Sequence, residues 1–235
     1  MATPLDDGSW EFRGTRLRFP VRIGEASAAC ATYLAATSRA RELVAGTGLE
    51  PVSVAGRTPL FLLVVDYRVN DLGVYDEVGV ALPVRHRGRT GLHIHQLPVT
   101  TEFTMEAGRA LWGLPKWLAR IELAVDGRDA SCRLADVDGT HVLTAALRTL
   151  PLRLPCTVPG TVTALAPHDG AVLASTVRAR VGGIRAGLGG ARLVLGSGHP
   201  MADELRALRL PRRPVATVIA DRVSFEMDAA REVPR

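Results

Sequence analysis

Hydrophobic and polar residues alternate with a period of two along most of the chain, and turn residues separate the alternating segments. Leu17, Phe19, Val21 and Ile23 alternate with arginines, as expected for a strand with one buried face. The same pattern predicts further strands over residues 61–69, 74–84, 91–99, 116–125, 130–136, 141–150, 160–166, 171–181, 191–195 and 214–225. So many short strands predict a β-rich fold.

Three segments predict helices instead. An alanine-rich stretch over residues 27–45 is followed by Gly46, which suits the end of a helix. Residues 101–112 have acidic side chains early and are followed by Gly113, and residues 201–208 form the third segment. Together the elements predict a mainly β (α+β) fold, an antiparallel β-barrel or sandwich with a few peripheral helices.

Length and hydropathy predict one domain. The chain has 235 residues, of which 47% are hydrophobic and 23% charged, and no shift in composition marks a linker. We therefore expect a single domain over residues 1–235. The longest apolar run, residues 59–65, is too short to span a membrane, and the N-terminus is acidic where a signal peptide is basic. These features predict a cytoplasmic protein without a membrane partner.

The basic net charge of +5 raises the question of nucleic-acid binding. The arginines are spread along the whole chain, with the tightest cluster at residues 85–89, and only 5% of the residues are aromatic. An electrostatic footprint for nucleic acid needs clustered charge, so we predict no nucleic-acid partner. The chain has 28 arginines and one lysine, Lys116.

Cysteine and histidine spacing predicts no metal site, and the lack of a P-loop or a complete dinucleotide-binding glycine motif predicts no organic cofactor. Cys30, Cys132 and Cys156 are odd in number and lack Cys-x-x-Cys spacing, so we expect small buried side chains in a reducing compartment. His93 and His95 share one face of a strand and could supply two metal ligands, but no third ligand is evident. A polar pocket lining or a solvated edge is the alternative for this pair.

The position of Lys116 favours a chemical role. It follows Gly113, Leu114 and Pro115, which fix the backbone before it and suit a side chain aimed into a cavity. Arginine cannot lose its proton, whereas a lysine amine can be made neutral by burial and then attack a carbonyl carbon. Composition alone favours the other interpretation, in which Lys116 is a single lysine on the surface.

Two blocks of sequence resemble the acetoacetate decarboxylase family. Residues 106–116, Glu106-Ala-Gly-Arg-Ala-Leu-Trp-Gly-Leu-Pro-Lys116, are similar to the Schiff-base lysine motif Gly-Arg-Glu-x-Trp-Gly-x-Pro-Lys. Residues 72–78 are similar to the upstream Gly-x-Tyr-x-Glu segment, and a weaker likeness includes Arg16 and residues 197–204. The resemblance implies a β-barrel around the reactive lysine and a homo-oligomer.

The resemblance also implies roles for single residues. Lys116 falls on the imine-forming lysine, Glu77 on the glutamate that faces it, and Arg16 on an arginine near the site. Lys116 would form an imine with a small β-keto acid, and Glu77 would move the proton that follows loss of carbon dioxide. Arg16 would bind the substrate carboxylate or stabilise Glu77. Tyr75 and Trp112 are expected to pack around the site and line the substrate pocket.

This chemistry requires a neutral amine. An unperturbed lysine is neutral about once in 2,500 molecules at pH 7, so a pKa depressed by about three to four units is expected at Lys116. Decarboxylases of the family have a second lysine, whose charge was proposed to contribute, directly after the first, where this chain has Trp117. Burial would therefore have to supply the depression.

Further departures keep other functions open. Ala110 replaces the glutamate of the motif, and Leu62 stands where an additional glutamate is expected. Imine formation is thus a firmer expectation than decarboxylation. One alternative is an aldolase, dehydratase or cyclase of the same superfamily that acts on a keto acid or a polyketide-like intermediate. The other is a barrel that binds a ligand without catalysis.

Overall fold

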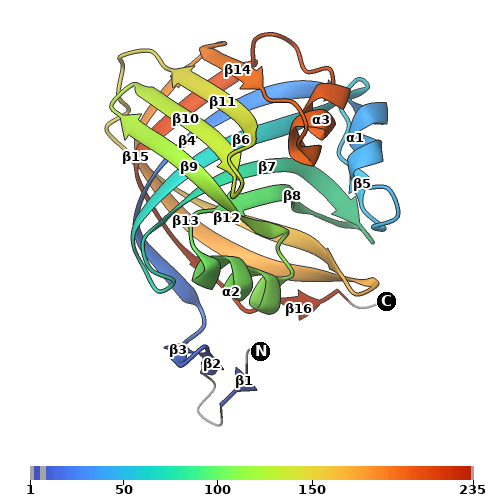
Figure 1. The fold of residues 1–235 in the computed structure, drawn as a ribbon, viewed down its shortest axis with the longest axis vertical. Coiled ribbons are helices and arrows are strands. Elements are labelled where there is room, and N and C mark those ends of the chain that lie inside the picture. The colour runs from blue at the N-terminus through green and yellow to red at the C-terminus, as the bar shows by residue number, and fades with distance from the viewer. Residues whose placement is uncertain (1–2, 6–8, 234–235) are drawn as a thin grey trace.

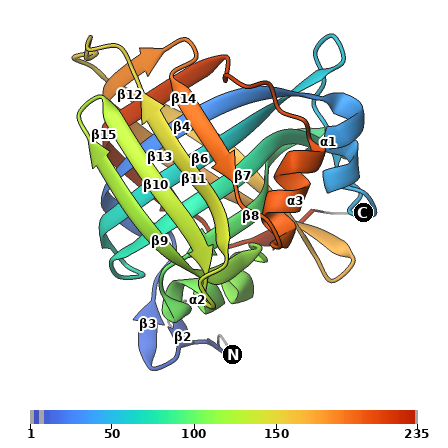
Figure 2. The same ribbon diagram turned by 45° about the horizontal axis from the view of Figure 1, so that its top comes forward.

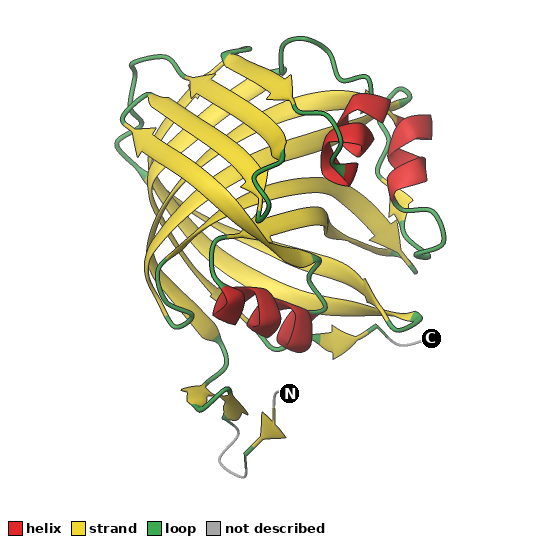
Figure 3. Ribbon diagram, in the orientation of Figure 1, coloured by secondary structure: helices red, strands yellow, loops and turns green. Residues whose placement is uncertain are grey.

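The computed structural model describes residues 3–5 and 9–233, and strands account for most of them (Figure 3). The helices are α1 (Thr37–Leu43), α2 (Glu102–Trp112) and α3 (Pro200–Ala207). The strands are β1 (Thr3–Pro4), β2 (Trp10–Phe12), β3 (Thr15–Leu17), β4 (Val21–Ala36), β5 (Glu50–Pro51), β6 (Arg57–Asn70), β7 (Tyr75–His86), β8 (Arg89–Val99), β9 (Lys116–Asp126), β10 (Asp129–Asp136), β11 (His141–Arg148), β12 (Thr157–His168), β13 (Ala171–Gly187), β14 (Ala191–Leu195), β15 (Ala216–Met227) and β16 (Arg231–Glu232). None of the described helices is long and apolar enough to cross a membrane. The mainly β fold expected from the sequence is confirmed.

The strands form a small N-terminal sheet, β1-β2-β3, and one large sheet. The order of the large sheet is β14-β11-β10-β9-β8-β12-β13-β15-β4-β6-β7-β5, and β16 pairs with β13. Its long strands curve around a common interior, with α2 below them next to the start of β9 (Figure 1). Closure into a barrel and the single domain over residues 1–235 stay predictions.

Strand β8 corrects the expectation of a purely antiparallel sheet. It pairs antiparallel with β7 but parallel with both β9 and β12. Parallel neighbours need a long crossover, and α2 supplies one between β8 and β9. The helix therefore returns the chain to the edge of β8, where β9 begins at Lys116.

The helix predicted over residues 27–45 is wrong. This segment is mostly the second part of β4, and a helix is present only in α1. β4 pairs with β15 on one edge and β6 on the other, and its alanines lie on two covered faces. A strand buried on both faces loses its polar alternation, so the pattern along the sequence is that of a helix.

Most other elements agree with the pattern of the sequence. Helices α2 and α3 lie within one residue of their predicted ranges, and Gly113 ends α2 with a φ of 65°. The first predicted strand is divided, because β3 ends at Leu17 and β4 begins at Val21. The predicted strands between residues 61 and 225 are present, several of them longer than expected.

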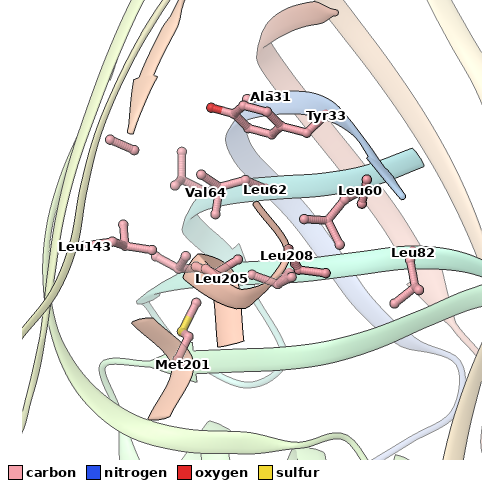
Figure 4. Packing of buried hydrophobic residues seen from close by; sticks show 14 of the residues in the cluster. Ala31, Tyr33, Leu60, Leu62, Val64, Leu82, Leu143, Met201, Leu205 and Leu208 are labelled. Atoms are coloured by element: carbon pink, nitrogen blue, oxygen red, sulfur yellow. The ribbon is translucent and has the colours of Figure 1, made fainter. Parts of the chain in front are cut away.

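Two hydrophobic clusters fill the interior. In the larger one, Tyr33, Leu62 and Val64 of β4 and β6 pack near Met201 and Leu205 of α3 (Figure 4). Helices α1 and α3 lie side by side at one end of the sheet (Figures 1 and 2). The second cluster joins α2 to β7, β8 and the N-terminal strands. This second cluster surrounds Lys116.

The expectation of three buried cysteines holds only in part. All three are free thiols. Cys132 is buried and Cys30 is half-buried, but Cys156 is exposed. The segment that contains Cys156 runs over the surface before β12 begins at Thr157, and its side chains therefore remain in solvent.

Candidate functional site

The end of α2 places Lys116 at the start of β9. The backbone N–H groups of Gly113 and Leu114 donate to the carbonyl oxygens of Arg109 and Gly108, both at 3.1 Å, which closes the helix. The chain then enters β9, where Lys116 pairs with Leu97 of β8. The side chain of Lys116 points into the protein and is only 4% exposed.

Lys116 and Glu77 form a buried ion pair. The Nζ atom of Lys116 lies 2.8 Å from Oε2 of Glu77, and Glu77 is 8% exposed. Tyr67 donates its hydroxyl to Oε1 of Glu77 at 3.0 Å, and Nζ also donates to Oγ1 of the fully buried Thr104 at 3.2 Å. The ring of Tyr75 lies with its centre 5.0 Å from Nζ. Residues from β6, β7, β9 and α2 thus converge on one amine.

The ion pair determines the protonation of the lysine. Burial by itself lowers the pKa of Lys116. The charges of Glu77 and Tyr75 and the hydrogen bonds to these two residues raise it by more, so the pKa lies above the ordinary value. The expectation of a depressed pKa is therefore wrong for this resting state. The carboxylate of Glu77 lies 2.8 Å from the ammonium of Lys116, within the distance at which a proton can pass between them.

The pair opens onto an apolar chamber of about 430 Å³. Its wall is built by residues of β4, β6, β7, β8, β12, β13 and β15 together with the end of α2. Among the described residues, Lys116 and Glu77 are the charged side chains of this wall, and Tyr75 and Trp112 also line it. A larger and more open depression, of about 670 Å³, lies over β10, β11 and β14 and contains none of the predicted site residues.

The structure brings together four of the five predicted site residues. Lys116, Glu77, Tyr75 and Trp112 line the chamber, and the indole N–H of Trp112 donates to the carbonyl oxygen of Asp228 at 2.9 Å. Arg16 lies on β3, is exposed, and is not part of the chamber wall. Its role toward a substrate or Glu77 stays a prediction.

Three residues of the site were missed from the sequence. Thr104 and Tyr67 hold Lys116 and Glu77, and Gly108 packs directly against the lysine side chain. A glycine inside a helix is unfavourable by about 0.5–1 kcal/mol relative to alanine, so Gly108 was the available signal. Thr104 and Tyr67 have no comparable signal, because only the fold brings them to Lys116.

Trp117 lies on the opposite side of β9 from Lys116. Its indole N–H donates to Oε1 of Gln96 at 3.0 Å, and its ring stacks on His199 with centres 4.9 Å apart. It fixes β9 against β8 and α3 and does not enter the chamber. A side chain at residue 117 therefore has no direct path to Nζ of Lys116.

Both histidines of the pair, His93 and His95, are within hydrogen-bond distance of other protein groups. Nδ1 of His93 lies 3.1 Å from the carbonyl oxygen of Leu165, and Nε2 of His95 lies 3.1 Å from Oε2 of Glu204. Within residues 3–5 and 9–233, no group of three or more His, Cys, Asp or Glu side chains is arranged to hold a metal ion. His93 is buried and is thus not part of a solvated edge.

Comparison with protein families gives a match over most of the chain. The acetoacetate decarboxylase family model matches residues 2–226. Among curated proteins, acetoacetate decarboxylase of Acidiphilium cryptum is 39% identical and acetoacetate decarboxylase 1 of Bradyrhizobium diazoefficiens is 41% identical, each over 54 residues. These aligned segments cover 23% of this chain and only 22% of each relative.

Solved structures show the same fold. Acetoacetate decarboxylase of Legionella pneumophila superposes with a TM-score of 0.70 and 15% identity, covering 95% of this chain and 91% of that chain. The enduracididine biosynthesis enzyme MppR superposes with a TM-score of 0.68 and 18% identity, covering 91% and 88%. Another MppR structure holds the condensation product of pyruvate and imidazole 4-carboxaldehyde.

Proposed function

The chain belongs to the acetoacetate decarboxylase family, and from this we propose that it is a lyase that decarboxylates a β-keto acid through an imine on Lys116. The observation that carries the proposal is the buried pair of Lys116 and Glu77, 2.8 Å apart, at an apolar chamber. An amine next to a proton acceptor in an apolar cavity suits attack on a ketone. No cofactor is required for this chemistry.

The first step forms the imine. Glu77 takes a proton from the ammonium of Lys116, and the neutral Nζ attacks the ketone carbon of the substrate. The proton returns from Glu77 to the carbinolamine oxygen, which leaves as water together with a second proton from nitrogen. The product is a protonated imine with the same charge as the original ammonium, so this step neither takes up nor releases a net proton.

Charge balance in the chamber then favours loss of carbon dioxide. The substrate carboxylate adds a negative charge to a wall where, among the described residues, Lys116 supplies the one positive charge and Glu77 already opposes it. When the carbon–carbon bond breaks, its electrons pass into the iminium and produce a neutral enamine. A proton taken up from water and delivered through Glu77 converts the enamine to the product imine, which water hydrolyses.

Borohydride trapping tests imine formation. Incubation with acetoacetate and borohydride should add the mass of the reduced adduct to Lys116, which is the single lysine of the chain. Lys116→Arg retains the charge but cannot form an imine, and should give no adduct. An unmodified Lys116 across a panel of β-keto acids contradicts the proposal. A Lys116→Arg variant that still fulfils the protein's role in its pathway would instead favour a barrel that binds a ligand without catalysis.

Release of carbon dioxide separates decarboxylation from the second candidate. The MppR structure with a condensation product shows that a protein of this fold holds such a compound, which favours aldol or dehydration chemistry as that candidate. Trapped adducts together with released carbon dioxide support a decarboxylase. Adducts without carbon dioxide, and a condensation product when an aldehyde is added, support the aldolase.

Two predictions on assembly and location complete the proposal. The family resemblance implies a homo-oligomer, and the second prediction is a cytoplasmic location. Light scattering on the purified protein tests the first, and a mass equal to that of one chain contradicts it. Fractionation of the source cells tests the second.

A further inference from the structure

We propose that the substrate carries an apolar alkyl chain on its ketone carbon, longer than the methyl group of acetoacetate, and that this chain occupies the chamber next to Lys116. The inference rests on the proposed function for the imine chemistry. It replaces the small β-keto acid expected from the sequence. It is argued from the size of the chamber, the side chains of its wall and the charges available there.

The chamber is too large for a small keto acid. Its volume of about 430 Å³ equals the share of roughly fourteen water molecules in the liquid. Acetoacetate has seven non-hydrogen atoms and would leave much of this space unfilled. Protein interiors are otherwise packed as tightly as organic crystals, so an apolar space of this size next to a buried nucleophile indicates room for a ligand.

Strand register shows where this space lies relative to the ion pair. Glu77 is in register with Val65 of β6, which pairs with Ala28 of β4 and through it with Ala220 of β15. Two residues further along the strands, about 7 Å away, is a second layer of the wall. It consists of Gly79, Leu63, Cys30 and Val218.

The four residues of the second layer include no aromatic and no charged side chain. A Cβ on Gly79 would make only ordinary contacts with Leu97 and Leu63, at 3.5 and 3.6 Å, so the backbone there does not require glycine. Because residue 79 has no side chain, the chamber is wider at this point. On the other side of Glu77 the wall contains the stacked rings of Tyr67 and Tyr75, with centres 4.4 Å apart. The apolar chain therefore points toward Gly79.

The charges of the wall exclude a second anionic group on the substrate. Among the described residues of the wall, Lys116 is the single cation, and it becomes the imine. A carboxylate at the far end of the substrate would lie among Leu63, Cys30 and Val218 without a partner, which is strongly unfavourable. The substrate is thus charged only at the carboxylate that leaves.

Binding of secondary alcohols tests the chain separately from the chemistry. The series from propan-2-ol to decan-2-ol matches the alkyl ketone products but cannot form an imine, and Trp112 in the chamber wall gives a fluorescence signal. Each added methylene should lower the dissociation constant about fourfold until the chamber is filled, since burial of one methylene contributes about 0.8 kcal/mol. A dissociation constant independent of length overturns the proposal. Adducts with acetoacetate would in that case still support the imine, whereas length-dependent binding without any adduct would contradict only the proposed function.

A variant in the second layer provides a further test. Val218→Phe fills the space beyond Glu77 and should shift the preferred alcohol, and the preferred β-keto acid, to a shorter chain. Val194→Phe on β14 is the matched control, because Val194 is 44% exposed and outside the chamber, and it should leave the series unchanged. An identical length preference in wild type and Val218→Phe would overturn the placement of the chain.

Discussion

Gly108 of α2 lies against the side chain of Lys116 so closely that a Cβ at residue 108 would come within 2.5 Å of Cδ and 2.8 Å of Cε of the lysine. Glycine inside a helix is unfavourable by about 0.5–1 kcal/mol relative to alanine. α2 contains it because this position leaves room for Lys116 to reach Glu77. The helix thus shapes the path of the nucleophile as well as closing the chamber.

The Gly108→Ala variant should fold but lose most of its reactivity. The new methyl group meets the flexible end of a side chain, so Lys116 moves away from Glu77 while the backbone stays in place. A displacement of about 1 Å from the reacting geometry can reduce the rate about 100-fold, and borohydride trapping measures it. Gly160→Ala is the control, since nothing lies within 4 Å of a Cβ there. Equal trapping rates in both variants would contradict this role of Gly108.

The Glu77→Gln variant should make Lys116 easier to deprotonate and yet catalytically poor. In the wild type burial lowers the pKa of Lys116, and the charges of Glu77 and Tyr75 with their hydrogen bonds raise it by more; without the charge of Glu77 the pKa falls. Loss of the proton carrier should reduce turnover by about 100- to 10,000-fold. The pH dependence of acylation at Lys116, followed by mass spectrometry, measures the first effect.

The same pair links stability to pH in the alkaline range. Folding raises the pKa of Lys116 from its ordinary value of 10.5. The stabilisation that the charged amine provides is therefore fully present below pH 10.5 and is lost as the pH rises through the pKa of the folded state. Glu77→Gln should remove this dependence. Glu122→Gln, at an exposed position on β9, the strand of Lys116, should retain it. Matching alkaline unfolding curves for the wild type and Glu77→Gln would argue against the ion pair.

The Trp117→Lys variant should not reproduce the effect that the second lysine of family decarboxylases has on the neighbouring lysine. Residue 117 points away from the chamber, and its ring stacks on His199 and donates to Gln96. A new ammonium there leaves the pH dependence of trapping at Lys116 unchanged, while loss of the partly buried indole lowers stability by about 0.5–3 kcal/mol. Trp117→Phe retains a ring without charge and serves as the control. A trapping profile shifted to lower pH in Trp117→Lys alone would contradict the geometry.

The sequence predicts those helices and strands whose residue pattern depends only on neighbouring residues along the chain. Strands with one solvated face keep their alternation, and Gly113 marks the end of α2 because a left-handed residue is needed there. β4 was missed because both of its faces are covered, and only its pairing with β6 and β15 identifies it as a strand. Alanine there reflects the narrow space available rather than helix propensity.

The candidate site shows the same division. The motif at residues 106–116 and the segment at 72–78 indicate Lys116 and Glu77 through family resemblance, without any distance between them. Their contact of 2.8 Å is a tertiary property, and it reverses the expected direction of the pKa of Lys116. Thr104 and Tyr67 are likewise assigned by the fold, since no local pattern distinguishes them from other buried hydroxyl groups.

A buried histidine should make the protein sensitive to mild acid. Burial is the main cause that lowers the pKa of His93 from 6.5 to about 4; the carbonyl oxygen of Leu165 opposes this shift and the charge of His95 adds to it. Below pH 6.5, His93 is therefore protonated in the unfolded chain, whereas in the folded protein it stays neutral down to about pH 4. Stability thus falls as the pH drops through this window.

The His93→Leu variant isolates this contribution. Between pH 7.5 and 5 the wild type should lose about 2 kcal/mol more unfolding free energy than His93→Leu, measured by urea denaturation. The pKa of Asp76 is raised to about 6, mainly by burial, and acts in the opposite direction, but both proteins contain it and it cancels in the difference. His168→Leu, at an exposed position, should behave as the wild type. If His93→Leu lost as much stability as the wild type, the acid sensitivity would have to come from other groups.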